Sequence, residues 1–510
     1  MRCTAAELRA LVRELEQGRA RAQAAVLASV LAEDYEPCGV GELAERAGVS
    51  ESAVRALQAR GILAAREREL IRRPEPGEPL FAYAAPTLNA AQERVLSAVT
   101  RAQGEHRFAP FLLCGVTGSG KTEVYIRAIE RALAAGRTAL VLVPEISLTP
   151  QAMERYRHRL GDRVGILHSG LSGGERFDAW RRARSGELSV IIGTRSAVFA
   201  PLSKLGLIVV DEEHDGSYKQ DDPAPRYHGR DVAMMRARLA ACPILLGSAT
   251  PALESYTNAL EKKYTLLSLP RRAVEHDLPD VELVDMRGHD PDKGPLSDEL
   301  AEALDECLAA GGQAILFLNR RGFSPQVLCA RCGHIVQCPS CSVALVQHKQ
   351  PPGLLCHHCE HRQPEPRICP ACHGEWMRYR GVGTEQLAQW VEENYAGARI
   401  ARLDLDTTRK RDAHTRLLSA FRRRETDVLV GTQMISKGLD MPGVTLVGVI
   451  DADIGLAMPD FRSAERTFML LTQVAGRAGR GEHPGRVFIQ SHCPNPYAVL
   501  AAISQNYEAL

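Results

Sequence analysis

A glycine-rich octapeptide, GVTGSGKT at residues 115–122, restricts the possible folds of this chain more than any other stretch of it. The apolar run FLLC precedes the octapeptide, and the helix-forming run EVYIRAIERAL follows it. A strand, a glycine turn and a helix in this order make a phosphate-binding loop, in which backbone N–H groups and the helix N-terminus face the phosphates. The octapeptide therefore predicts a parallel α/β sheet that holds a nucleotide at the carboxyl ends of its strands.

Two side chains of this loop have defined tasks. We expect Lys121 to reach the β- and γ-phosphates and Thr122 to hold Mg²⁺ through its hydroxyl. Gln92, in the upstream run TLNAAQERVL, lies where a glutamine that reads adenine would be placed, with an ordinary helix position as the alternative. Close approach of the backbone to the phosphates is predicted at Gly115, Gly118 and Gly120.

Acidic residues end another apolar run, LGLIVVDEEH. Asp211 at the strand tip suits a second contact to Mg²⁺, and Glu212 is placed to orient and deprotonate an attacking water. Strand ends are often acidic and exposed, but together with the phosphate loop this pair predicts hydrolysis of a nucleoside triphosphate.

The run QVAGRAGRG near the end of the chain places Arg477 and Arg480 on one helical face. Two arginines brought to the γ-phosphate from a second lobe would stabilise charge in the transition state. A surface ion-pairing face is the alternative. The interleaved glycines disfavour it, because they indicate close approach of another backbone.

Two sets of short apolar runs alternate with helical stretches, and each set predicts a parallel sheet buried on both faces. A proline-containing stretch precedes the first set, and a cysteine-rich stretch interrupts the second set between its first and second strands. The expected parts are an N-terminal helix with a winged helix-turn-helix (1–73), a linker (74–86), a first lobe (87–267), a second lobe (268–325 and 379–490), a cysteine-rich insertion (326–378) and the start of a further domain (491–510).

The helix-turn-helix prediction rests on the run GELAERAGVSESAVRALQARG. Gly48 ends the first helix, Ser50 caps the second, and Gly61 ends the second. The β-prone run ILAARERELIRR would then form the wing. Arginines on the second helix and the wing favour DNA contact, although such units also serve as protein adaptors.

Eight of the 14 cysteines lie between residues 329 and 372. In a reducing cytosol this clustering favours metal binding over disulfides. Eight thiolates suffice for two closed, tetrahedral Zn²⁺ sites, which are structural because they leave no open coordination position. An iron–sulfur cluster is the rival, and the spacing leaves the pairing open. The cysteines form four C-x₂-C pairs: Cys329/Cys332, Cys338/Cys341, Cys356/Cys359 and Cys369/Cys372.

Composition excludes several classes of protein. No apolar run approaches the roughly 18 residues that cross a bilayer, and the charged N-terminus has no signal-peptide core. These features predict a cytoplasmic protein without a membrane partner. The net charge is only +1, so a nucleic-acid surface must come from local patches.

Several runs in this order resemble the motifs of superfamily 2 helicases, which have two RecA-like lobes. They are GVTGSGKT, VLVPEISLTPQ, GTRSAVFAP, DEEH, GSATP, FLNRRG, VGTQMISKGLD and QVAGRAGR. The longer forms DEEHDGSYKQ, PRYHGRD and DADIGLAMPDFRSAERTFMLLTQVAGRAGR, with the eight-cysteine insertion, resemble the PriA family of bacterial replication-restart helicases. The resemblance implies an ATP-dependent, 3′-to-5′ DNA helicase that remodels stalled forks and initiates primosome assembly.

The resemblance also implies roles for individual residues. The ATPase set is Lys121, Thr122, Asp211, Glu212, Gln473, Arg477 and Arg480, with Ser248 and Thr250 coupling hydrolysis to DNA movement. The residues that hold phosphates of the DNA strand would be Thr194, Arg195, Gly431 and Thr432. A loop that senses single-stranded DNA would include His214, Tyr218, Lys219, Arg226, Tyr227 and His228. Zinc pairing would be nested, with Cys329, Cys332, Cys369 and Cys372 on one ion and Cys338, Cys341, Cys356 and Cys359 on the other.

As partners the resemblance implies branched forks, single strands, primosome proteins and single-stranded-DNA-binding protein, for a monomer at the bacterial nucleoid. Three features depart from the family. Its N-terminal β-rich domain and its C-terminal domain have no match, which leads us to expect a fragment, a split gene or a mis-called start. Leu439 stands where the family commonly has His. This difference concerns the coupling of ATP hydrolysis to DNA movement and not the binding of ATP. A translocase that does not unwind, and a zinc-bearing scaffold with a dispensable motor, remain alternatives.

Overall fold

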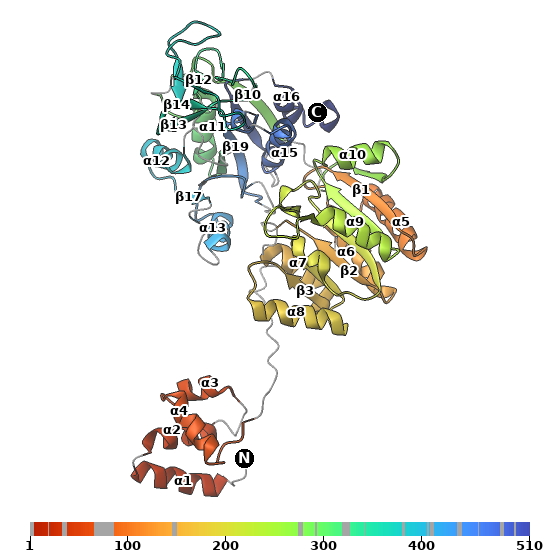
Figure 1. Cartoon of the computed structure of the whole chain (residues 1–510), viewed down its shortest axis with the longest axis vertical. Coiled ribbons are helices and arrows are strands. Elements are labelled where there is room, and N and C mark those ends of the chain that lie inside the picture. Colours follow the sequence, from red (N-terminus) through yellow and green to blue (C-terminus); the bar gives the residue numbers. More distant parts are fainter. Residues whose placement is uncertain are drawn as a thin grey trace. The chain divides into compact units, whose positions relative to one another are not determined.

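A computed structural model covers the chain, which forms two compact units, Met1–Arg72 and Arg73–Leu510 (Figure 1). The structure describes residues 5–18, 20–32, 38–65, 86–144, 150–273, 279–290, 293–318, 327–341, 343–379, 383–404, 407, 413–435, 441–456, 458, 460–479, 484–493 and 496–510. Within these ranges, each helix is too short or too polar to span a membrane.

The first unit is helical. Its helices are α1 (Ala5–Gln17), α2 (Arg21–Ala32), α3 (Val40–Arg46) and α4 (Glu51–Ala59). Leu8, Leu27 and Leu57 are fully buried in its core. The predicted helix-turn-helix corresponds to α3 and α4. Ser50 does precede α4, but its hydroxyl bonds to Ser52 Oγ (2.7 Å) rather than to the helix backbone. The predicted wing falls mostly on residues outside the described ones.

The first lobe of the second unit contains a seven-stranded parallel sheet in the order β3-β4-β2-β5-β8-β1-β9. Its strands are β1 (Ala109–Gly115), β2 (Thr138–Leu142), β3 (Val164–Leu167), β4 (Val190–Gly193), β5 (Leu205–Asp211), β8 (Pro243–Ser248) and β9 (Thr265–Leu269), with the small hairpin β6 (Lys219–Gln220) and β7 (Tyr227–His228). Its helices are α5 (Ala90–Gly104), α6 (Lys121–Ala134), α7 (Pro150–Leu160), α8 (Gly173–Ser185), α9 (Gly229–Leu239) and α10 (Leu253–Leu260).

Neighbouring residues of these strands point to opposite faces of the sheet. Leu113 and Val141 enter the core under α5, α6 and α7, whereas Leu112 and Leu140 enter the core under α8, α9 and α10. Burial on both faces explains the continuous apolar runs. The sequence pattern did not predict β9, an edge strand with three exposed residues, and β9 ends two residues after the expected end of this lobe.

The second lobe contains a six-stranded parallel sheet in the order β10-β20-β19-β11-β18-β17. Its strands are β10 (Asp280–Asp285), β11 (Gln313–Leu318), β17 (Ile400–Leu403), β18 (Val428–Gly431), β19 (Val444–Asp451) and β20 (Arg486–Ser491). Its helices are α11 (Asp298–Ala309), α12 (Thr384–Asn394), α13 (Ala413–Arg422), α14 (Asp453–Leu456), α15 (Ser463–Ala475) and α16 (Tyr497–Ile503). The predicted pair of parallel α/β lobes is confirmed.

One detail of the second lobe differs from expectation. The edge strand β10 was missed because its exposed residues alternate with partly or fully buried ones, so the cysteine-rich insertion follows the second strand of the lobe rather than the first. The segment 491–510 is expected to begin a further domain, which stays a prediction, and its helix α16 packs on this lobe. Val499 and Ala502 of α16 are buried with Phe468 of α15.

The cysteine-rich insertion has five short strands in two small sheets. The strands β12 (Val327–Cys329) and β16 (Met377–Tyr379) pair at its base, and β13 (Val346–Lys349), β14 (Pro352–Leu355) and β15 (Arg362–Gln363) form an antiparallel sheet. Its hydrophobic core consists of a few residues, including Val336, Leu345 and Leu354. Such a core is too small to hold a fold alone, so cross-links through the cysteines are needed.

Candidate functional site

The phosphate loop joins β1 to α6 as the octapeptide predicts. Gly118 and Gly120 both have φ of +83°, a left-handed conformation that side chains other than glycine rarely adopt. Helix α6 begins at Lys121, whose Nζ donates a hydrogen bond to Gly115 O (2.7 Å). The lysine is therefore folded over the loop that it is expected to serve.

Gln92 holds the preceding helix against this loop. Its side-chain amide donates to Ser119 O (2.9 Å), and its Oε1 accepts a hydrogen bond from Asn89 N (2.9 Å). Asn89 Oδ1 in turn accepts from Gln92 N (2.9 Å), which caps α5. Both ends of the Gln92 side chain thus contact protein groups beside the phosphate loop.

Asp211 is held at the end of β5 by a buried tyrosine. Tyr125, on α6, is fully buried and donates a hydrogen bond from Oη to Asp211 Oδ1 (3.0 Å). Gly247 on β8 makes room for the tyrosine, since a Cβ there would overlap the Tyr125 hydroxyl. Burial and the neighbouring Glu212 raise the pKa of Asp211 to about 6, whereas Lys121 and the Tyr125 hydrogen bond oppose this rise.

Glu212 has an unusual backbone and an available carboxylate. Its φ is +45°, which is rare for a residue with a side chain and is common at functional sites. Its Oε2 is buried and has no hydrogen-bond partner within the described part of the chain. His214 Nδ1 lies 3.7 Å from this oxygen, beyond hydrogen-bond range.

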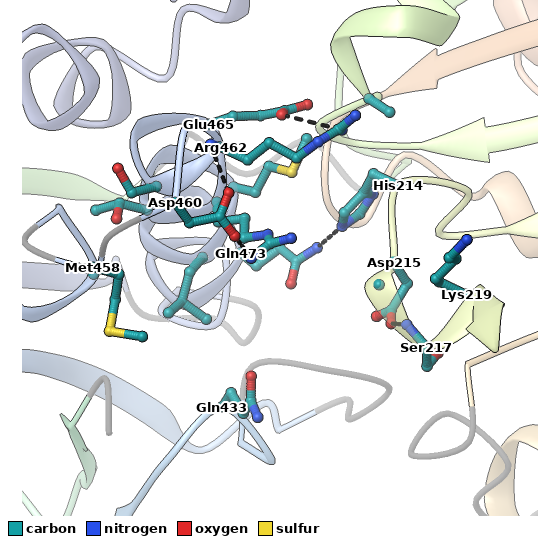
Figure 2. A pocket seen from close by; sticks show the side chains of 18 of the residues that line it. His214, Asp215, Ser217, Lys219, Gln433, Met458, Asp460, Arg462, Glu465 and Gln473 are labelled. Atoms are coloured by element: carbon teal, nitrogen blue, oxygen red, sulfur yellow. Dashed lines mark hydrogen bonds and ion pairs between the residues drawn. The ribbon is translucent and has the colours of Figure 1, made fainter. Parts of the chain in front are cut away.

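A chain of hydrogen bonds connects this region to the second lobe. Gln473 of α15 donates from Nε2 to His214 Nε2 (2.8 Å), and Figure 2 shows the two side chains pointing toward each other. His214 Nδ1 then donates to Ser248 Oγ (2.7 Å), which also accepts from Thr250 N (2.9 Å). Ser248 and Thr250, expected to couple hydrolysis to DNA movement, are therefore connected through His214 to Gln473 of the second lobe.

The second lobe also touches the phosphate loop. A Cβ placed on Gly476 would lie 2.9 Å from Thr117 Cβ, so glycine is needed there for the lobes to approach. Arg477, the next residue, is buried. Arg272, after β9, donates to Gly479 O (2.7 Å), and Ala273 N donates to Gly118 O (2.9 Å). Arg480 lies outside the described residues.

A cavity of about 900 Å³ lies between the two lobes, beside this network. From the first lobe, His214 and Lys219 line it; from the second, Gln433 and Gln473 do (Figure 2). At its edge, Leu253 N donates to Glu465 Oε1 (3.0 Å). The cavity has polar and charged walls from both lobes, which suits a charged, extended ligand.

The loop expected to sense single strands is folded onto the nucleotide region. Tyr218 is fully buried and donates from Oη to the Asp211 carbonyl (2.6 Å). Arg195 supports the loop by donating to Lys219 O (2.6 Å). Tyr227 is half-buried in an edge-on contact with the exposed Phe199, with ring centroids 5.2 Å apart. The adjacent Arg226 is exposed.

A glycine–threonine turn occurs at the same place in both lobes. Thr194 N donates to Leu167 O (3.1 Å) at the end of β3, and Thr432 N donates to Leu403 O (3.3 Å) at the end of β17. In each case a Cβ on the preceding glycine would collide with that carbonyl. Four residues were expected to bind phosphates of the DNA strand. Three of them, Thr194, Gly431 and Thr432, thus belong to two equivalent turns, and Arg195 directly follows the first turn.

The eight cysteines form two groups of four. Cys329, Cys332, Cys369 and Cys372 make one, and Cys338, Cys341, Cys356 and Cys359 make the other, with all sulfur atoms of a group within 4.8 Å of one another. The Sγ–Sγ distances are 3.6 Å for Cys329 and Cys372, 3.7 Å for Cys332 and Cys369, and 3.5 Å for Cys338 and Cys359. Thiolates about 2.3 Å from a zinc ion lie about 3.8 Å apart in a tetrahedron, so both groups fit structural Zn²⁺. This is the nested pairing that the resemblance implied.

Each C-x₂-C pair sits on the same kind of turn. The first cysteine donates its N–H to the carbonyl five residues later, at 2.9, 2.8, 2.8 and 2.9 Å for Cys329, Cys338, Cys356 and Cys369. The residue after the second cysteine has positive φ at Gly333, Glu360 and His373. The repeated turn explains why His373 adopts a left-handed backbone without being a ligand in the group.

We call the group of Cys329, Cys332, Cys369 and Cys372 the outer zinc group and the other the inner zinc group. The outer zinc group is attached to the second lobe. Gly288 N donates to Ala330 O (3.0 Å), and Cys493 Sγ donates to Gly333 O (3.2 Å). A Cβ on Gly333 would collide with the carbonyl of His492, so the turn lies directly on the end of β20. The inner group, with β13 to β15, is carried by the outer one.

Sequence reasoning missed several residues that shape the site. Tyr125 follows the phosphate loop and Gly247 opens the GSATP motif, but neither residue was assigned a role. Glu213 was missed as well: it is fully buried and accepts hydrogen bonds from Arg230 (2.9 Å), Ser255 Oγ (2.7 Å) and Ala252 N (2.7 Å). The signal in the sequence was a third acidic residue after the apolar strand, within the DEEH run.

Family models match three parts of the chain. They are a DEAD/DEAH box helicase domain at residues 89–259, a helicase conserved C-terminal domain at 379–482 and the PriA DNA helicase Cys-rich region domain at 338–364. The first two coincide with the nucleotide-binding lobe and most of the second lobe. The third covers the inner zinc group.

Curated proteins match most of the chain. It is 46% identical to replication restart protein PriA of Bacillus subtilis over 93% of this chain and 59% of that protein. It is 45% identical to the Synechocystis protein of the same name, over 92% and 57%. The chain thus spans about three fifths of the length of these relatives. A solved structure of RecG bound to a three-way DNA junction aligns at 17% identity and a TM-score of 0.47, over 82% of this chain and 46% of RecG, which is too low to add to the argument.

Proposed function

We infer that the chain belongs to the PriA family of replication restart proteins, and we propose that it acts as an ATP-dependent DNA helicase of 3′-to-5′ polarity. Its task would be to recognise and remodel stalled or abandoned forks and to start primosome assembly. One observation supports the motor above all: Gly476 of the second lobe contacts Thr117 of the phosphate loop, so nucleotide state and lobe position can affect each other.

On the nucleotide side, Lys121 would bind the β- and γ-phosphates while Glu212 deprotonates the attacking water. Arg477, with Arg480, would stabilise charge on the γ-phosphate from the second lobe. Mg²⁺, when present with ATP, neutralises phosphate charge. Thr122 and Asp211 would hold it, and its positive charge would favour the ionised form of Asp211, whose pKa burial and Glu212 raise.

Tyr125 would fix the orientation of Asp211, so Tyr125→Phe is expected to raise the Mg²⁺ concentration for half-maximal ATPase activity about tenfold. A hydrogen bond to a charged group contributes about 1.5 kcal/mol or more, which is about tenfold. Mn²⁺ binding, followed by electron paramagnetic resonance in the presence of nucleotide, would weaken equally. Tyr156→Phe is the matched control, because Tyr156 is also buried near Asp211. Unchanged Mn²⁺ affinity in Tyr125→Phe would refute the role.

On the DNA side, Thr194, Arg195, Gly431 and Thr432 would hold phosphates of one strand across the cavity. Lys219 and Arg226 would add charge, and Tyr227 a stacking face. The hydrogen bonds from Gln473 to His214 and on to Ser248 would transmit the state of the nucleotide to this strand. The buried Tyr218 would link this loop to the nucleotide site through its hydrogen bond to the Asp211 carbonyl.

The other parts of the chain complete the proposal. The two zinc ions would be structural and would present the insertion near the separating strands. The helices α3 and α4 would contact duplex DNA. We further propose a monomer in the bacterial cytoplasm, associated with the nucleoid, that meets primosome proteins and single-stranded-DNA-binding protein.

A strand-displacement assay on forked duplexes tests the proposal. We expect displacement that requires ATP and Mg²⁺, occurs on forks that offer a 3′-to-5′ track, and disappears in Lys121→Ala. A non-unwinding translocase would hydrolyse ATP in response to single strands but would displace none, and that result would refute a helicase. Fork restart by Lys121→Ala as efficient as by the unchanged protein would favour a scaffold instead.

A further inference from the structure

Helix α8 presents aromatic and basic side chains on its outer face. Phe177, Trp180, Arg181 and Arg184 follow the i, i+3, i+4, i+7 spacing of a single helical face, and all four are exposed. Phe177 is 58% exposed and Trp180 37%. The opposite face packs into the core of the first lobe through Ala183. Large aromatic side chains left at the surface of a packed helix indicate a binding function.

These four side chains form two similar pairs. The Arg181 guanidinium lies over the Phe177 ring at 5.6 Å from its centroid, and that of Arg184 lies over the Trp180 ring at 5.5 Å. Each pair joins a cation and an aromatic face at i, i+4 spacing. The two pairs are offset by three residues along the helix, so the surface repeats one chemical unit twice.

The charge of this face is positive. Arg176 is exposed beside the two pairs, which gives three arginines. Among the acidic residues of α8, Glu175 accepts a hydrogen bond from the backbone at the start of the helix (2.7 Å), and Asp178 is buried. A ligand with regularly spaced negative charges and flat apolar rings therefore complements this face.

We propose that the outer face of α8 is a second binding site for single-stranded DNA, in which bases stack on Phe177 and Trp180 and phosphates contact Arg181 and Arg184. Stacking on aromatic side chains and contact with guanidinium groups are the two interactions that bind single strands without sequence preference. Side chains at i and i+3 have Cβ atoms about 5–6 Å apart. This exceeds the roughly 3.4 Å base step of a duplex, so the rings suit unstacked bases of a single strand.

The site is continuous with the strand path of the proposed function, on which this inference rests. Thr194 N bonds to Leu167 O at the end of β3, and α8 begins at Gly173, shortly after that strand. Figure 1 shows α8 along the margin of the first lobe, beside β3. A strand held at Thr194 can therefore continue past the end of β3 onto α8, outside the cavity between the lobes.

The dependence of binding on strand length tests this site. Fluorescence anisotropy would measure the affinity of the full chain for labelled oligo(dT), starting at about 8 nucleotides, the scale of one single-strand site. We expect Phe177→Ala/Trp180→Ala to bind long strands at least tenfold more weakly than the unchanged protein does. The same double variant should bind the shortest strands and the nucleotide as tightly as the unchanged protein. Met235→Ala/Leu239→Ala, which removes two exposed apolar side chains from α9, is the control and should bind all lengths normally.

The fluorescence of Trp180 gives a second readout. The chain has three tryptophans, so replacing Trp376 and Trp390 by phenylalanine leaves Trp180 alone. Long oligo(dT) should quench it, as base stacking does, and duplex of equal length should not. Normal binding of all lengths by Phe177→Ala/Trp180→Ala, without quenching of Trp180, would overturn the α8 site alone. Failure of the unchanged protein to bind any single strand would overturn the proposed function with it.

Discussion

Replacing Glu212 by glutamine is expected to lower the rate of ATP hydrolysis by about 10²–10⁴-fold, the usual contribution of a general base. Glutamine keeps the size of the side chain but cannot take a proton from water. Glu212 has a left-handed backbone, and its buried Oε2, which has no hydrogen-bond partner among the described residues, is available for a water. Steady-state ATPase assays with single-stranded DNA would measure the loss.

Nucleotide affinity separates this effect from misfolding. Glu212→Gln should bind a fluorescent ATP analogue as tightly as the unchanged protein and should melt at the same temperature. Glu213→Gln is the contrasting variant, because Glu213 is fully buried and paired with Arg230. Removing one partner of a buried ion pair mainly costs stability. If Glu213→Gln slowed hydrolysis at full stability while Glu212→Gln did not, the assigned base would be wrong.

Cys329→Ser and Cys338→Ser are each expected to reduce the bound zinc from two ions per chain to one. Serine is a much poorer ligand than thiolate, and a site with three thiolates loses most of its affinity. Zinc content of the purified protein, measured by mass spectrometry, gives the count directly. The double variant should retain no zinc.

The two variants should differ in their effect on the motor. The outer group, which includes Cys329, is bonded to the second lobe through Ala330 and Gly333, so its loss should lower the melting temperature of that lobe and the ATPase rate. The inner group contacts lobe 2 through the outer one, so Cys338→Ser should hydrolyse ATP normally. Cys493→Ser is the control, since Cys493 donates a hydrogen bond to Gly333 beside the outer group but belongs to neither group of four cysteines. Loss of zinc in Cys493→Ser would contradict the assignment.

Local patterns were enough to predict most of the fold. The phosphate loop and the continuous apolar runs determine a parallel sheet, because a strand buried on both faces cannot alternate apolar and polar residues. The edge strands β9 and β10 escaped prediction for the converse reason: each is partly exposed, so its pattern resembles an ordinary surface segment. Zinc pairing required the family resemblance, since the spacing of four equal pairs does not select one arrangement.

Contacts between distant segments could not be predicted from local patterns. The bond from Tyr125 to Asp211 depends on a third strand, where Gly247 leaves space for the ring. Likewise, the burial of Tyr218 follows from how its loop folds onto β5, whereas its sequence context suggested only an aromatic side chain for stacking. Such effects depend on tertiary packing, which a single sequence does not encode in any short pattern.

Two equivalent glycine–threonine turns, one in each lobe, would sense the spacing of phosphates and nothing of the bases between them. A strand with an abasic position or a bulky base adduct has the same phosphate spacing as an intact strand. A motor that advances by exchanging one such grip for the other would therefore pass chemical damage on its track, but would stop at a gap or at an uncharged backbone. Tolerance of lesions would be a useful property for the proposed remodelling of stalled forks.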